Sequence, residues 1–316
     1  MADKTSDLAS QIRKKHKMSR KIKSVKVYRK DLILRSASDS ELEEVNMLHA
    51  EVYYNENGKT TKEVKYTKSG DVEQIFEFKY NDKGQVVEEI MKEDEDTVVE
   101  RKTFEYENDK ISKELLHYLD GSFDTEFYSY DNEGRLVEKK RIDCDEEVEE
   151  ITNYEYENGE LKRIKIIDGD EDILYLSEKV FDAKGNPVEE KEYDGIEETK
   201  SKKINEFDDN GNKTASFIYD ENERLIEKYI YKENDKGQLL EIIEESLRGK
   251  HTIKFEHDDN GNIVVQKEYD NDDKLITDIK KEYDNNIILG TVVSSEKPVP
   301  GGFYNYTLNY DYEYYN

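Results

Sequence analysis

Aromatic and charged residues alternate along much of this chain, in short segments that each end at a turn. Residues 76–80 (FEFKY) and 154–156 (YEY) show the pattern clearly. A period of two predicts β-strands with one aromatic face and one charged face. An aliphatic residue usually returns six positions after the last aromatic residue, as Val86 does after Tyr80, so we expect a second strand after each turn.

The turns share the pattern aromatic-Asp/Asn-x-x-Gly. It occurs at 54–58, 80–84, 130–134, 181–185 and 207–211, and at 257–261 with His257 in the aromatic position. Copies without the glycine lie at 106–110, 219–223, 269–273 and 283–287, and a shorter one at 156–159. Asp and Asn cap local N–H groups, and Gly accepts the positive φ of a hairpin loop. Connections this short predict antiparallel neighbours.

The aromatic anchors of these turns recur at steps that alternate between 12 and 14 residues, so that pairs of units repeat about every 26 residues. Roughly 16 strands spaced about 4.8 Å apart would give a sheet on the order of 75 Å long if it stayed open. Such a sheet must twist, coil or stack. We therefore predict an all-β fold of antiparallel hairpin repeats that form a long twisted or coiled sheet, without deciding whether it closes.

Three segments differ in character. Residues 1–50 form a basic N-terminal arm that is predicted to be partly helical or disordered, with Ser6 as a helix cap and a second short helix over 38–52. Residues 51–290 hold the repeats. Residues 291–316 contain a proline-rich connector and a tyrosine-rich stretch, for which we expect a strand that caps the sheet end or an assembly surface.

Charge is abundant and uneven. Charged residues make up 40% of the chain, 24 residues are Tyr, and the formal net charge is −28. Residues 1–35 hold 12 Lys/Arg against 3 Asp/Glu (+9), and the remainder holds 37 against 74 (−37). An acidic body repels nucleic acid and anionic membranes and favours cationic partners.

The basic arm is a candidate docking segment, either on the chain's own acidic repeats or on a partner. Two other interpretations stay open, a solvated basic leader and a segment that binds nucleic acid or anionic lipid. The residues that carry its charge are Arg13, Lys14, Lys15, Lys17, Arg20 and Lys21.

The sequence favours a cytoplasmic protein. It has one cysteine, Cys144, and therefore no intrachain disulfide, and it contains neither an 18-residue apolar run nor an apolar signal segment.

The unit YDNEGRL at 130–136, with FDDNGNK at 207–213 and HDDNGNI at 257–263, resembles the YD repeats of RHS-type bacterial proteins. The resemblance covers about residues 50–290 and implies a spiralling β-sheet. This chain is too short and too acidic for the toxin-enclosing shells of that family. YNENGK at 54–59 and YENGEL at 156–161 are also similar to MORN-type repeats of antitoxin-like proteins.

Motifs for catalysis are absent. The sequence has no phosphate-cradling glycine loop, no GxSxG and no HExxH. His251 and His257 lie six residues apart without further ligands in a zinc-binding pattern. Acidic turns such as 168–172 raise the question of calcium, but ordinary hairpin chemistry accounts for them. We expect no enzymatic activity and no cofactor.

These features predict a protein-binding or structural scaffold that presents an acidic, tyrosine-rich surface. The alternatives are a bacterial immunity protein that neutralises a basic toxin by charge complementarity and an enzyme acting on carbohydrate. The expected partner is another protein, with a basic surface, or a subunit of an assembly. The candidate binding surface consists of the anchors Tyr80, Tyr106, Tyr130, Tyr156, Phe181, Phe207, Tyr219 and Tyr269.

Overall fold

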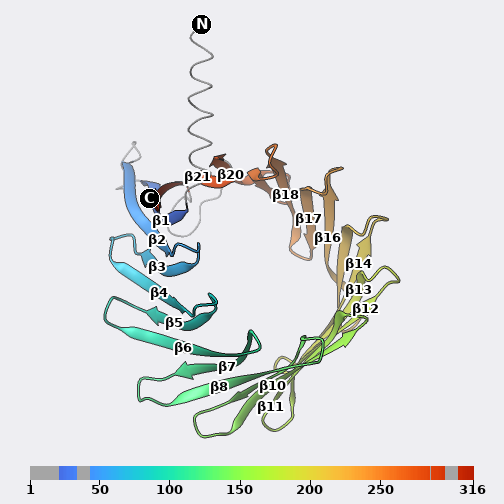
Figure 1. Ribbon diagram of the computed structural model, residues 1–316. Coiled ribbons are helices and arrows are strands. Elements are labelled where there is room, and N and C mark those ends of the chain that lie inside the picture. The colour runs from blue at the N-terminus through green and yellow to red at the C-terminus, as the bar shows by residue number, and fades with distance from the viewer. Residues whose placement is uncertain (1–20, 34–42, 285, 296–304) are drawn as a thin grey trace.

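The computed structural model describes residues 21–33, 43–284, 286–295 and 305–316, and these form a single sheet of 22 strands (Figure 1). The all-β prediction is confirmed. The strands are β1 (Ile22–Ile33), β2 (Glu43–Tyr54), β3 (Thr60–Tyr66), β4 (Val72–Tyr80), β5 (Val86–Lys92), β6 (Val98–Glu107), β7 (Lys110–His117), β8 (Phe123–Tyr130), β9 (Leu136–Ile142), β10 (Val148–Glu157), β11 (Glu160–Asp168), β12 (Ile173–Phe181), β13 (Pro187–Asp194), β14 (Thr199–Phe207), β15 (Lys213–Asp220), β16 (Leu225–Glu233), β17 (Leu239–Ser246), β18 (Gly249–His257), β19 (Ile263–Tyr269), β20 (Leu275–Asp284), β21 (Ile287–Ser295) and β22 (Tyr306–Tyr314).

The sheet closes on itself. Each strand pairs antiparallel with the next, and β22 pairs with both β21 and β1, so that the ring of Figure 1 has no free edge. The predicted long, twisted or coiled sheet of repeats is therefore wrong, and the estimate of roughly 16 strands is too low. Closure satisfies the row of N–H and C=O groups that every open edge would leave unpaired.

Both terminal segments supply strands at the seam. Residues 22–33 and 43–54 are strands, so the helix predicted over 38–52 is wrong for its described part. Strand pairing on both sides of β2 overrides the helix propensity of its Glu and Leu residues. The tyrosine-rich stretch forms β22, which joins two strands instead of ending the sheet. The part of the chain that the structure describes contains no helix able to span a membrane.

Side chains alternate between an outer wall and a lumen. On β6, Val99, Arg101 and Glu105 are exposed, whereas Lys102 and Tyr106, which point to the other face, are half-buried. Side chains on the convex face of a barrel diverge and those on the concave face converge, so the more exposed set faces outward. Cross-strand partners lie on the same face of the sheet. The outward-facing and lumen-facing side chains therefore form two continuous sets around all 22 strands.

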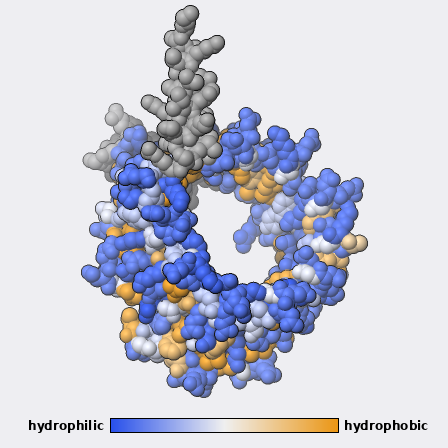
Figure 2. Space-filling model, in the orientation of Figure 1, coloured by the Kyte–Doolittle hydropathy of each residue, from blue (hydrophilic) through white to orange (hydrophobic). Residues whose placement is uncertain are grey.

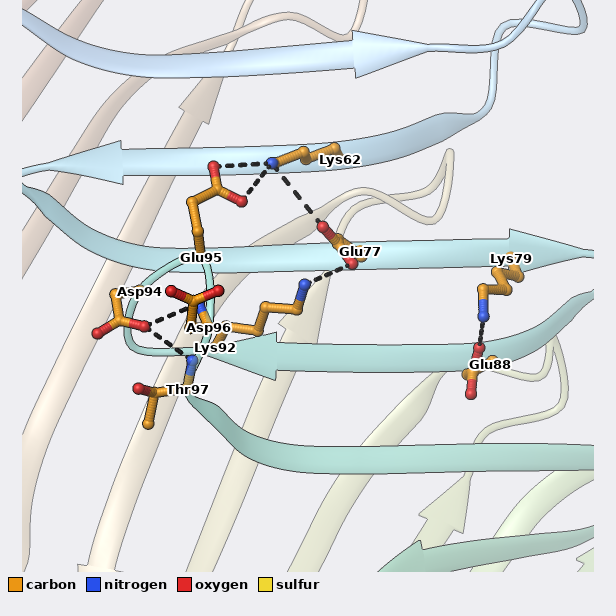
Figure 3. A network of polar contacts seen from close by, with 9 residues as sticks. All are labelled: Lys62, Glu77, Lys79, Glu88, Lys92, Asp94, Glu95, Asp96 and Thr97. Carbon is orange, nitrogen blue, oxygen red and sulfur yellow. Dashed lines mark hydrogen bonds and ion pairs between the residues drawn. The ribbon is translucent and has the colours of Figure 1, made fainter.

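The outer wall carries Lys and Glu in cross-strand pairs (Figure 3), beside exposed apolar residues such as Val99 and Phe127. Lys62 Nζ lies 3.8 Å from Glu77 and 3.1 Å from Glu95, and Lys92 Nζ lies 3.0 Å from Glu77. Each exposed pair contributes at most about 1 kcal/mol, but opposite charges across strands favour the observed register.

The passage through the ring is open and wide in the space-filling view (Figure 2). Few apolar side chains are buried in this single-layered wall; among the described residues they are Val25, Val64, Ile75, Ala215 and Val293. The fold therefore depends on continuous hydrogen-bonded ladders and on cross-strand pairs more than on a thick core.

Candidate functional site: the lumen and its two rims

Successive turns lie at opposite ends of the barrel, which gives it two different rims. The first, here called the anchor rim, comprises the turns at 55–59, 81–85, 108–109, 131–135, 158–159, 182–186, 208–212, 234–238 and 258–262 and Asn286. The second, here called the acidic rim, comprises 67–71, 93–97, 118–122, 143–147, 169–172, 195–198, 221–224, 247–248 and 270–274.

Most turns on both rims have the same backbone geometry. In the turn after β8, the Gly134 N–H donates to the Asp131 carbonyl at 2.9 Å, and Asp131 Oδ1 accepts the N–H groups of Glu133 and Arg135. The Arg135 backbone N–H, together with its guanidinium, lowers the pKa of Asp131. A charged carboxylate that caps these N–H groups explains why the turns begin with Asp or Asn.

The anchor tyrosines fasten neighbouring hairpins to one another. The hydroxyl of Tyr80 donates to the Thr60 carbonyl at 2.6 Å, about one repeat earlier in the chain, and Tyr106 does the same to Val86 at 2.7 Å. Tyr130 bonds Ile111 and Tyr156 bonds Leu136 at 2.9 and 2.8 Å. Each tyrosine thus connects the end of one strand to the first or second residue after the preceding turn of the same rim.

The structure divides the predicted binding surface into two groups. Tyr80, Tyr106, Tyr130, Tyr156, Phe181 and Phe207 end even-numbered strands, lie at the anchor rim and face the lumen. Tyr219 and Tyr269 end odd-numbered strands at the acidic rim and face outward, opposite Lys202 and Thr252. Successive hairpins point toward opposite rims. Turns of the same handedness therefore place their anchor residues on opposite faces of the sheet.

Cations reinforce the anchor rim from turn to turn. Lys110 Nζ donates to the Gly134 carbonyl at 2.6 Å and lies 4.9 Å from the ring centre of Tyr130. Lys59 makes the equivalent contacts with Gly84 and Tyr80. The repeat spacing alone reveals neither these lysine contacts nor the hydrogen bonds of the tyrosine hydroxyls.

The acidic rim carries far more charge. Its turns contain 20 Asp/Glu against 4 Lys/Arg, a balance of −16, whereas the described anchor-rim turns contain 11 against 5, a balance of −6. The most acidic turns, 93–97 and 143–147, hold four carboxylates each. The opening at this rim is therefore the more negative of the two.

Several acidic residues occupy a backbone position that suits glycine. Seven anchor-rim turns place Gly with positive φ at the fourth position, for example Gly134 at 81° and Gly185 at 87°. At the equivalent position the acidic rim has Gly70 and Gly121 in two turns, but Glu146, Glu171, Glu223 and Asp273 in four others, with φ between 55° and 68°. A left-handed conformation costs such residues about 1–2 kcal/mol relative to Gly.

Tyrosine–carboxylate pairs line the lumen. The hydroxyl of Tyr128 donates to Glu126 and Glu114, and burial together with these carboxylates raises the pKa of Tyr128. Burial and a 2.8 Å hydrogen bond to Glu192 raise the pKa of Tyr175 to about 12. These phenols stay protonated at neutral pH and donate hydrogen bonds to the carboxylates.

The candidate docking arm lies almost entirely outside the described residues, since Arg13, Lys14, Lys15, Lys17 and Arg20 belong to residues 1–20. Lys21 is described, and its carbonyl accepts a 2.9 Å hydrogen bond from the Tyr315 N–H beside the seam. Among the described residues, no group of three or more His, Cys, Asp or Glu side chains is arranged to hold a metal ion.

No protein-family model matches the chain, and no curated protein sequence matches it. The resemblance to YD repeats therefore stays a prediction.

Solved structures give only weak similarity. A porin-like protein from Bacteroides uniformis is 13% identical over 92% of this chain and 96% of that chain, with a TM-score of 0.33. A porin-like protein from Bacteroides vulgatus is 12% identical over 84% of this chain and 99% of that chain, at 0.25. A TcdB2-TccC3-Cdc42 structure is 11% identical over 86% of this chain and 19% of that chain, also at 0.25. Scores this low do not establish a common fold.

Proposed function

We propose that this chain is a non-catalytic binding protein whose acidic rim holds a cationic polypeptide at the mouth of the lumen. The observation that carries the proposal is the presence of Glu146, Glu171, Glu223 and Asp273 at left-handed turn positions. Glycine at these positions would favour the fold, as it does on the other rim. Charged residues at positions where they strain the backbone are typical of functional sites.

The lumen behind this rim suits the same type of occupant. Its tyrosine–carboxylate pairs offer acceptors for ammonium and guanidinium groups, and its rings offer faces for cation–π contacts. A basic toxin would be one such polypeptide, so an immunity protein remains the alternative function, supported by the same charge asymmetry. The charged outer wall is compatible with water on all sides, and the cytoplasmic location predicted from the sequence stays a prediction.

Titration with a fluorescently labelled peptide of ten lysines tests the proposal. The variant Asp145→Asn/Glu146→Gln/Glu171→Gln removes three charges from adjacent acidic-rim turns. Because long-range attraction at low ionic strength depends on nearby charges, we expect affinity to fall by about tenfold.

The matched control is Asp82→Asn/Asp209→Asn/Asp259→Asn, which removes three exposed charges from the anchor rim and the same total from the molecule. We expect this variant to bind almost as well as the parent. Equal weakening of the two variants would mean that the peptide responds only to net charge, and the proposal would then fail.

A further inference from the structure

A cavity of about 300 Å³ opens on the outer wall next to the acidic rim. Its lining includes side chains from β12, β13 and β14, which stand at the right of Figure 1, and the turn at 221–224 reaches its edge. Leu176 and Tyr193, both half-buried, supply the apolar part of the lining. The volume lies at the lower end of the range for small-molecule sites, so a ligand of few atoms fits.

One wall of the cavity is basic. Lys191 and Lys202 are direct cross-strand partners, and Lys200 lies opposite Tyr193 on the same face. Like charges directly opposite each other destabilise a sheet. Each of these two lysines forms an ion pair: Lys191 Nζ lies 2.9 Å from the Glu189 carboxylate, and Lys202 Nζ lies 3.5 Å from the Glu223 carboxylate.

Lys200 differs from these two lysines. Among the described residues it forms no ion pair, and its ammonium lies 5.8 Å from the ring centre of Tyr193. This wall is unusual in a chain with a net charge of −28, and it leaves one ammonium available for an anion.

The turn at 221–224 contributes acidic residues to the lining. Glu221 and Glu223 belong to the turn at 221–224, and both are exposed. Four of the five lining carboxylates already have partners. Glu223 lies 3.5 Å from Lys202 and Glu178 lies 3.2 Å from Arg163 Nε. Asp220 lies 2.6 Å from Arg224, and Glu192 accepts a 2.8 Å hydrogen bond from the Tyr175 hydroxyl. The cavity thus combines Lys200 and Glu221, which form no ion pair among the described residues, with the apolar surface of Leu176 and Tyr193.

We propose that this cavity binds a small zwitterion with an apolar side chain, of the free amino acid type. The ligand carboxylate lies against Lys200, with Lys191 and Lys202 beside it, and the ligand ammonium faces Glu221. The apolar side chain packs on Leu176 and Tyr193. This inference does not depend on the proposed function of the acidic rim.

Three related probes separate these contributions: L-phenylalanine, phenethylamine, which lacks the carboxylate, and 3-phenylpropionate, which lacks the ammonium. Calorimetric or NMR titration should show L-phenylalanine binding about tenfold more tightly than either of the others, because each lacks one charge-assisted contact. Phenethylamine that binds as tightly as L-phenylalanine would overturn the proposal, since the basic wall would then contribute nothing. Absence of binding by all three probes would overturn it as well.

The variant Lys200→Gln assigns the effect to this cavity. We expect it to bring the affinity for L-phenylalanine to within about twofold of that for phenethylamine, while the circular dichroism of the barrel stays unchanged. The matched control is Lys254→Gln, because Lys254 also lies over an outer-wall tyrosine, 5.2 Å from the ring centre of Tyr269, but does not line this cavity. A preference for L-phenylalanine that survives Lys200→Gln, or disappears in Lys254→Gln, would contradict the assignment.

Discussion

At the scale of single residues, the anchor tyrosines combine two functions that the sequence does not separate. The rings of Tyr80, Tyr106, Tyr130 and Tyr156 face the lumen, and their hydroxyls connect one hairpin to another. Phe181 and Phe207 take the same position without a hydroxyl. Aromatic periodicity predicted where the anchors lie along the chain, but not that tyrosine hydroxyls join adjacent repeats.

Replacing one anchor tyrosine by phenylalanine measures the value of this connection. We expect Tyr106→Phe to lower the free energy of unfolding by about 1 kcal/mol, because the Val86 carbonyl loses its donor while the ring is retained. Chemical denaturation monitored by circular dichroism gives the difference. The matched control is Tyr219→Phe at the other rim, because the Tyr219 hydroxyl forms no such hydrogen bond with the described residues. A loss as large as that of Tyr106→Phe would contradict the interpretation.

At the scale of hairpins, turn chemistry was predictable, and turn location was predictable where an aromatic anchor precedes the turn. Asp or Asn at the first position and Gly at the fourth identified the anchor-rim turns directly. The turn at 143–147 was missed because Ile142 stands in the aromatic position and Glu146 stands in the position of the glycine. The strand β1 was also missed. Its basic residues suggested an arm, although apolar and polar residues alternate along part of it.

Turn substitutions should change stability and binding in opposite directions. Glu146→Gly should raise the free energy of unfolding by about 1 kcal/mol, because glycine adopts a φ of 67° without steric cost. Gly185→Ala, at a φ of 87° and with nothing within 4 Å of the added Cβ, should lower it by a similar amount. A stability loss in Glu146→Gly would show that the Glu146 side chain supports the fold, and would remove the main support for the binding function.

At the scale of the whole molecule, the difference between the rims follows from closure. In a closed barrel of 22 strands, alternate turns collect at opposite ends, so a difference in their composition becomes a difference between two openings. In an open sheet the same turns would line two parallel edges without enclosing a lumen. The sequence pattern is local, and the pairing of β1 with β22 joins residues almost 290 positions apart, which is why periodicity could not predict it.

A cross-link across the seam tests closure most directly. In a Cys144→Ser background, Lys26→Cys and Asp311→Cys place two thiols on directly opposed residues of the outer wall of β1 and β22. The pair Glu105→Cys and Lys113→Cys, partners within one hairpin, shows that the oxidation conditions work. The closed barrel predicts that the 26–311 disulfide forms within the monomer as readily as the control, seen as faster migration in non-reducing electrophoresis. Free thiols, or disulfides only between molecules, would contradict the closed barrel.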